Sequence, residues 1–285
     1  MKQETDKPTW TQVITPRRPF FSFPFKEVLS YKDLLFLFVR RDFVAFYKQT
    51  ILGPIWFFIQ PILTTIVFTI IFGRLANIST DGVPDILFYL AGVTAWGYFA
   101  ACWQGTMDIF RGNQHIFSKV YFPRVIMPLA VVITNLIRFG IQLLLFLLVY
   151  SFYLYTDATI KPNLTILLLP VLVIMMAMFS LALGMLISAL TVKYRDLVFL
   201  MQFAVQLAMY ATPVVYPLSI VSPEKQWILL LNPMTAIVET FRYGFLGSGV
   251  FDPIHLVISF SIIFIALVLG LLVFNKTEQS FLDIV

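Results

Sequence analysis

The chain has 285 residues, of which 59% are hydrophobic and only 12% are charged, with a net charge of +5. Soluble domains contain roughly 45–50% apolar and about 25% charged residues, so this composition excludes an ordinary soluble protein. Because a transmembrane helix needs roughly 20 apolar residues, the length allows about six spans and leaves no room for a sizeable soluble domain.

The N-terminal region is expected to be a cytoplasmic tail followed by an amphipathic helix. Residues 1–27 show no strong periodicity and are assigned to the tail. The pattern Ser30-x-x-Asp33 resembles a capping box and predicts a helix start within an interface helix at 28–50. Leu, Val and Phe side chains form one stripe of this helix, and Arg and Lys gather opposite, as is typical of a helix lying in the membrane interface. A soluble amphipathic helix is the alternative.

Six apolar segments follow, and they predict an all-α integral membrane protein with six transmembrane helices. The predicted spans are residues 51–75, 86–107, 125–155, 164–190, 197–215 and 254–274. A polar and basic loop at 108–124 separates the second and third spans, and residues 276–285 form a short cytoplasmic tail.

Residues 216–250, before the last span, are predicted not to cross the membrane. Prolines punctuate this region, and its apolar pieces are too short for a span. Ser222-Pro223 and Asn232-Pro233 each resemble a helix start, in which a capping residue precedes a proline at the first helical position. Two short helices that enter and leave on the same side would form a re-entrant hairpin. Such a hairpin must pack on protein or line a wet cavity, because irregular backbone is not tolerated in lipid.

The positions of Lys and Arg predict that both termini are cytoplasmic. Fifteen of these residues lie in the tails, the interface helix and the loops on that side, against four on the opposite side. Because the basic residues follow this topology, the net charge gives no indication of nucleic-acid binding.

The chain carries no recognisable site for ATP, coupling ions or metal. It has no phosphate-binding loop, since no Lys directly follows a Gly. No predicted span has an Asp or Glu near its centre, where secondary transporters usually place one. His115, His255 and the single Cys102 are isolated from each other, which predicts no metal site and no intramolecular disulfide. Active transport would therefore need energy from a partner.

Aromatic and polar residues in the predicted spans are candidates for lining a solute pathway. Aromatic faces suit the C–H surfaces of sugars, although a lipid-facing aromatic belt is the alternative. Arg138, the only central charge, would either line a pathway or be accommodated by packing. The candidate channel residues are Trp56, Trp96, Tyr98, Arg138, Gln202, Gln206 and Tyr210.

Three basic residues of the interface helix region are placed to meet a phosphate headgroup in the cytoplasmic leaflet. These residues are Arg40, Arg41 and Lys48. Ordinary attraction to anionic lipids explains them equally well.

Seven short motifs are spread along residues 47–234. They are YKQTILGP at 47–54, QP at 60–61, FGRL at 72–75, SKVYFPR at 118–124, VKYRD at 192–196, PVVYP at 213–217 and LNPM at 231–234. Together they resemble the membrane subunits of bacterial polysaccharide ABC exporters, which are type-2 ABC transporter permeases, over roughly residues 28–250. The most similar members export O-antigen, and teichoic acid and capsule exporters are close relatives.

The resemblance implies a permease of the inner membrane that is not itself an enzyme. It implies a homodimer with two copies of a separate ATPase, so this chain would bind no cofactor and ATP and Mg would be held by the partner. The cargo would be a polysaccharide linked to undecaprenyl pyrophosphate, whose head would meet the basic residues above.

The resemblance also assigns two working segments. A coupling helix that contacts the ATPase is placed near Arg111–Lys119, with Arg111, Gln114, His115, Ile116 and Lys119 as its candidate residues. The hairpin at 216–250 would form an outer gate, with Tyr216, Trp227, Asn232, Glu239 and Arg242 as candidates.

Two other functions remain as alternatives. A permease of the same architecture for drugs or small lipids would share the helix plan. A membrane-embedded glycosyl or acyl transferase would need a polar catalytic cluster, whereas Asp108, Asp196 and Glu239 are scattered along the chain.

Overall fold

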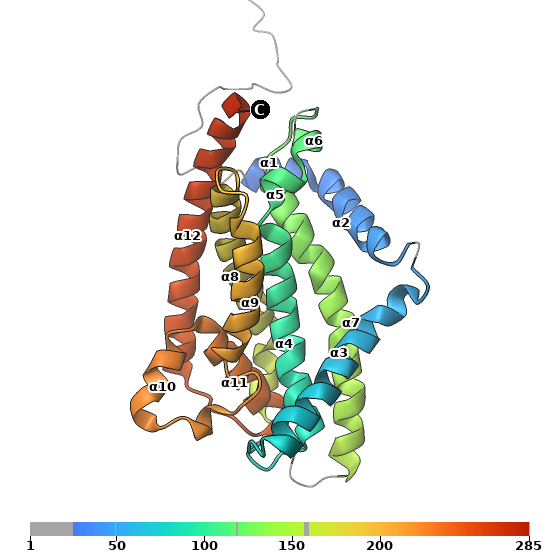
Figure 1. The fold of residues 1–285 in the computed structure, drawn as a ribbon, viewed down its shortest axis with the longest axis vertical. Helices are drawn as coiled ribbons and strands as arrows, with labels where there is room; N and C mark the ends of the chain where they lie inside the picture. Colours follow the sequence, from blue (N-terminus) through green and yellow to red (C-terminus); the bar gives the residue numbers. More distant parts are fainter. Residues whose placement is uncertain (1–24, 49, 118, 157–159, 285) are drawn as a thin grey trace, which may run out of the picture.

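The structure, a computed structural model, describes residues 25–48, 50–117, 119–156 and 160–284. Within these ranges it consists of helices joined by turns and contains no strand, which confirms the all-α prediction. The elements in chain order are α1 Phe25–Ser30, α2 Lys32–Tyr47, η1 Gly53–Ile55, α3 Trp56–Phe68, η2 Thr69–Leu75, α4 Asp85–Thr106, α5 Ile109–Gly112, α6 Gln114–Phe117, α7 Ile126–Thr156, η3 Leu164–Leu168, α8 Leu169–Thr191, α9 Leu197–Tyr210, η4 Leu218–Ile220, α10 Pro223–Leu230, α11 Pro233–Leu246 and α12 Pro253–Ile284 (Figure 1).

Five stretches of the described chain are long and apolar enough to cross a membrane. They are Gly53–Leu75, Asp85–Thr106, Ile126–Thr156, Leu164–Thr191 and Pro253–Glu278. They coincide with the first four predicted spans and with the last one.

The predicted fifth span is shorter than expected. The helix α9 ends at Tyr210 after 14 residues, and the chain then turns before Pro217. Fourteen helical residues extend about 21 Å, which is less than the roughly 30 Å of a bilayer core. Pro213 explains the early end, because a proline disfavours the helical conformation of the residue before it. The range 197–215 is therefore wrong for this helix, and a count of six spans stays a prediction.

The N-terminal helix differs from the prediction at both of its ends. The helix is interrupted at Tyr31, which precedes α2 and makes no side-chain cap. Ser30 is therefore the last residue of α1 and does not cap a longer helix. The helix α2 stops at Tyr47, and Lys48 is already extended. Residues 1–24 of the predicted tail lie outside the described residues.

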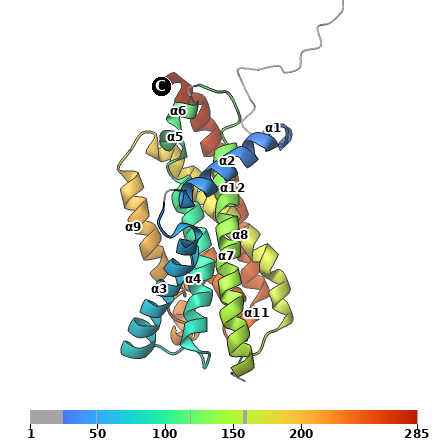
Figure 2. The ribbon, with the colours of Figure 1, turned by 90° about the vertical axis from the view of Figure 1, so that its right-hand side faces the viewer.

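The helix α2 lies across the upper part of α7 (Figure 2). Phe38 and Val39, on the inner side of α2, are buried. Phe36 and Leu37, on its outer side, are about three-fifths exposed. Exposed apolar side chains on this helix agree with a position in the membrane interface.

The core is formed around α4 and α8. In an apolar stretch of 18 residues within α4, 72% of the residues are buried, whereas only 17% are buried in the corresponding stretch of α12. The helix α4 is therefore central, and α12 lies at the perimeter. The helices α4 and α8 pack closely where Gly184 of α8 faces Thr106 of α4, because a Cβ at Gly184 would overlap the side chain of Thr106.

Segments predicted to be cytoplasmic lie together at one end of the molecule. Figure 1 shows α1, α5, α6 and the end of α12 at the top, with α10 and α11 toward the bottom. The helix α12 continues through most of the predicted C-terminal tail, to Ile284, and only Val285 of that tail lies outside the described residues.

Candidate functional site

A partly polar cavity of about 690 Å³ opens between α2, α3, α4 and α7. Its charged, amide and hydroxyl lining residues are Asp42, Gln60, Thr64, Tyr98, Gln104, Thr134, Asn135, Arg138 and Gln142. Aromatic rings of Phe46, Phe57 and Phe139 complete the wall. Polar side chains at membrane depth mark functional sites or water-filled spaces, so this cavity is the first candidate for a binding site.

Arg138 is held at the wall of this cavity by aromatic rings and one amide. Its guanidinium carbon lies 3.3 Å from the ring centre of Phe46 and 5.8 Å from that of Phe57. Its Nη1 donates to Oδ1 of Asn135 at 3.0 Å. Cation–π contact and a hydrogen bond explain how a central charge is tolerated. Both interpretations of this residue therefore have support, since it is packed and also faces a cavity.

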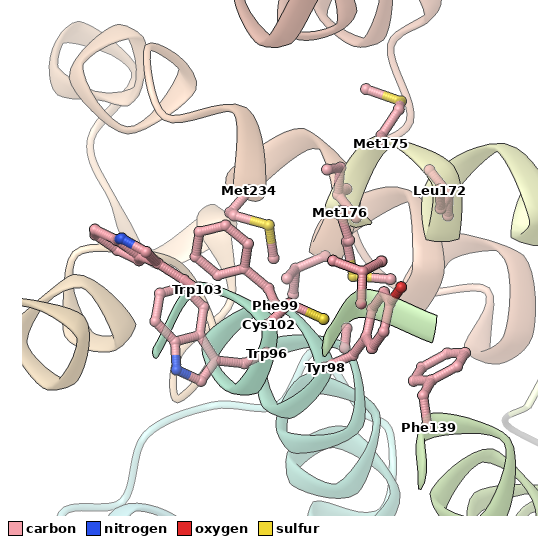
Figure 3. Close-up of a cluster of buried hydrophobic side chains, with 14 of the residues drawn as sticks. Trp96, Tyr98, Phe99, Cys102, Trp103, Phe139, Leu172, Met175, Met176 and Met234 are labelled. Carbon is pink, nitrogen blue, oxygen red and sulfur yellow. The ribbon is translucent and has the colours of Figure 1, made fainter. Parts of the chain in front are cut away.

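The aromatic channel candidates of α4 belong to the packed core. Trp96 and Tyr98 are 6% and 2% exposed. Their rings lie 5.2 Å from those of Phe99 and Phe139, respectively (Figure 3). The placement of Trp96 does not support a channel role, because a buried ring meets no solute; only Tyr98 also borders the cavity. Trp56 lies elsewhere, on the exposed surface of α3.

The candidates on α9 form a separate exposed surface. Gln202, Gln206 and Tyr210 are all exposed on that helix. None of the described cavity-lining residues comes from α9. The predicted channel residues are thus divided between a core, a cavity and an outer face within one chain.

The hairpin at 216–250 is organised around a buried ion pair. Arg242 and Glu239 are 0% and 2% exposed, and the closest oxygen and nitrogen of the pair lie 3.7 Å apart. Arg242 donates to the backbone carbonyls of Pro213 and Val214, and its guanidinium carbon lies 3.6 Å from the ring centre of Phe88.

Glu239 extends this network toward α12, because its Oε2 accepts from the backbone N–H of Val250 at 3.0 Å. The pair therefore connects α11 with the turn after α9, with α4 and with the chain leading into α12.

The remaining hairpin candidates differ in their surroundings. Asn232 caps α11 by accepting from the N–H of Met234, and it donates to Oγ1 of Thr212 at 2.8 Å, which confirms the helix start predicted there. The helix α10 does begin at Pro223, but Ser222 makes no side-chain cap. The hydroxyl of Tyr216 donates to the carbonyl of Tyr210, and Trp227 is exposed.

The expected coupling helix is two short helices, α5 and α6, separated by Asn113. The amide of Asn113 donates to the carbonyl of Ile109 at 3.1 Å, which competes with a continuous helix. The region near Arg111–Lys119, where a short coupling helix is expected, therefore holds the end of α5 and the whole of α6, and its coupling role stays a prediction. Arg111, Gln114, His115 and Lys119 are exposed, and Ile116 is half-buried.

The loop at 108–124, called the coupling segment below, contacts α12 through a residue that was not among the predicted candidates. Arg124 is buried, lies 5.2 Å from the ring centre of Phe117, and donates to the carbonyl of Glu278 at 3.0 Å. Burial lowers the pKa of this guanidinium from its usual value. The rings of Phe110 and Phe274 stack 4.5 Å apart beside it. The feature of the sequence that could have indicated Arg124 is its position directly before the predicted span at 125–155.

The basic residues of the interface helix region are exposed. Arg40 and Lys48 have no ion-pair partner among the described residues, whereas Arg41 pairs with Asp42 at 2.8 Å. Two of the three positive charges are thus available to a headgroup.

Comparison with known proteins identifies the family. The family model described as ABC-2 type transporter matches residues 33–246, which include the cavity, the coupling segment and most of the hairpin. The chain belongs to the ABC-2 type transporter family. It is therefore a membrane permease of an ABC transporter, which works with an ATPase partner, and not an enzyme. The transferase alternative does not agree with this membership.

Three relatives share the name O-antigen export system permease protein RfbA. One, from Myxococcus xanthus, is 30% identical over 220 residues, which cover 76% of this chain and 82% of the relative. Two from Klebsiella pneumoniae are each 26% identical over 254 residues, which cover 88% of this chain and 95% of the relative. The similarity to these ABC-2 type permeases extends over most of each chain.

Proposed function

We propose that this permease is the membrane-spanning subunit of an ATP-driven exporter that moves O-antigen, linked to undecaprenyl pyrophosphate, across the bacterial inner membrane. The observation that carries the proposal is its similarity, over most of its length, to permeases named for O-antigen export. Both termini face the cytoplasm in this proposal, as the positions of Lys and Arg favour. Teichoic acid, capsule, drug and lipid export are the alternatives.

The exposed face of α9 supports a homodimer. Phe199, Phe203 and Leu207 are between 52% and 71% exposed there, next to Gln202 and Gln206. An apolar face alone would suit lipid, but side-chain amides facing hydrocarbon are costly. A second copy of the chain would cover this face and place the amides along a central pathway for the polymer.

The coupling segment supports an ATPase on the end of the molecule that holds α5 and α6. Its outer side presents Arg111, Gln114, His115 and Lys119, and its inner side is fixed to α12 through Arg124. A conformational change in the ATPase would be transmitted to the membrane spans through these contacts. ATP and Mg would be bound by that partner, and Arg40 and Lys48 would attract the pyrophosphate head.

A photo-crosslinking amino acid at Gln114 is expected to link to the ATPase in the purified complex. The control position at the other end of the molecule is Trp227, which is also exposed but lies on α10 (Figure 1). We expect a strong product from position 114, none from 227, and a change in yield from 114 when ATP is added. An intact complex with no product from 114 or 116 would refute the assignment.

A further inference from the structure

The cavity between α2, α3, α4 and α7 lies inside a single subunit, and none of the roles proposed above uses it. Gln60, Gln104 and Gln142 reach it from three different helices. Among the described residues, none of these three side-chain amides has a hydrogen-bond partner. Gln60 and Gln104 are exposed and Gln142 is half-buried. Since an unsatisfied amide is costly in hydrocarbon, we expect water or a polar ligand at these side chains.

The charge of the cavity favours an anion. Arg138 is the only cation among its described lining residues, and Asp42 is the only anion. Asp42 is paired with Arg41 at 2.8 Å and makes no ion pair with Arg138, although it lies near enough to attract that guanidinium in part. Attraction in a partly enclosed site is stronger than in water, and this favours an anionic ligand.

The geometry of Arg138 favours a phosphate over a point charge. Phe46 covers one face of the guanidinium, and Asn135 accepts from Nη1, which together fix the plane of the group. Its Nε is fully buried and out of reach of a ligand. Its Nη1 is used by Asn135, whereas its Nη2 makes no hydrogen bond among the described residues. A planar guanidinium with unused N–H groups suits the paired oxygens of a phosphate.

The other walls favour a hydroxyl-rich group next to the phosphate. Side-chain amides both donate to and accept from hydroxyls, and the rings of Phe57 and Phe139 offer flat apolar surfaces. A volume of about 690 Å³ is within the range of small-molecule sites. It would take a sugar phosphate and not a polymer.

We infer that this cavity binds the sugar-phosphate headgroup of a membrane lipid, one in each subunit. A lipid is favoured over a soluble sugar phosphate because one wall of the cavity is the interface helix α2 and the others are membrane spans. The inference deepens the proposed function and rests on it only for the identity of the lipid. Recognition at this site would be independent of polymer length.

Binding of farnesyl pyrophosphate carrying one N-acetylglucosamine, measured on the purified full-length protein in nanodiscs, tests the inference. Arg138→Gln is expected to weaken binding about tenfold or more, because it removes a charged hydrogen-bonding partner of phosphate. Arg74→Gln, the matched control, removes the same charge from an exposed position outside the cavity and should leave binding unchanged. Equal affinities of Arg138→Gln and the unmodified protein would overturn the inference.

A second measurement keeps the test valid if Arg138→Gln does not fold. A cysteine placed at Ala101, which lines the cavity but has no polar side chain, should react with a maleimide, and the lipid probe should slow that reaction several-fold. The native Cys102 is buried and adds little background. An unchanged reaction rate at saturating probe would overturn the inference.

Two further probes separate the sources of the ligand. Farnesyl pyrophosphate without sugar and free N-acetylglucosamine 1-phosphate should each bind at least tenfold more weakly than the complete lipid. Equal binding of the free sugar phosphate would overturn the assignment to a lipid, and equal binding of the sugar-free lipid would overturn the role of the amides. Because binding is measured without ATP or an ATPase, failure of the export proposal would leave these results unchanged.

Discussion

Arg242→Met is expected to leave little folded protein. The substitution strands Glu239 in a site where it is 2% exposed, and it removes the donors that serve the carbonyls of Pro213 and Val214. Removing one partner of a buried ion pair costs about 3–5 kcal/mol, which is a large part of the roughly 5–15 kcal/mol that stabilises a typical domain. Thermal unfolding and the yield of monodisperse protein in detergent measure the loss.

Two comparisons isolate the cause of this loss. Arg111→Met breaks an ion pair with Asp108 that has the same three-residue spacing but is exposed, so it should cost about 0–1 kcal/mol. The double variant Glu239→Gln/Arg242→Met removes the stranded charge and should recover part of the stability. If the double variant is no more stable than Arg242→Met, the stranded carboxylate is not the cause.

Gly184→Ala is expected to destabilise the protein, against the usual effect of this change in a helix. A Cβ at Gly184 would overlap the hydroxyl of Thr106 and meet its backbone carbonyl carbon at 3.4 Å. Alanine normally gains roughly 0.5–1 kcal/mol over glycine within a helix. Overpacking costs typically about 1–3 kcal/mol and occasionally more, so the clash should outweigh the gain. Gly184→Leu should prevent folding altogether.

The control for Gly184 is another helical glycine with open space around it. A Cβ at Gly140 of α7 would meet nothing within 4 Å, so Gly140→Ala should be neutral or stabilising. Thr106→Ala removes the overlapping hydroxyl but keeps the Cβ, which lies 2.5 Å from the added methyl group. It should therefore restore only part of the stability of Gly184→Ala. A melting temperature for Gly184→Ala at or above that of the unmodified protein would contradict the close packing of α4 and α8.

Apolar length predicted much of the helix plan, because it is a local property of the chain. The start of α11 was equally readable, since Asn232 and Pro233 serve as cap and first residue there. The early end of α9 depended on the conformational effect of Pro213, which outweighed the apolar character of the residues around it.

The sequence pattern within each helix could not predict which helices pack side by side. Gln60, Gln104 and Gln142 are far apart in sequence, and only the packing of α3, α4 and α7 brings them to one cavity. Arg242 is one of the four basic residues assigned to the outer side, whereas it is fully buried within the hairpin. Trp96 shows the same limit, because an aromatic ring in a span suits a core as well as a pathway.

ATP-driven movement of lipid-linked O-antigen into inverted inner-membrane vesicles tests the export proposal most directly. The polymer is added with vesicles that contain the permease and its ATPase, and a membrane-impermeant glycosidase then digests whatever remains outside. We predict protection of the polymer only when ATP, the ATPase and this permease are all present. Equal protection in vesicles that lack the permease, or none in complete vesicles that transport a small lipid instead, would contradict the proposal.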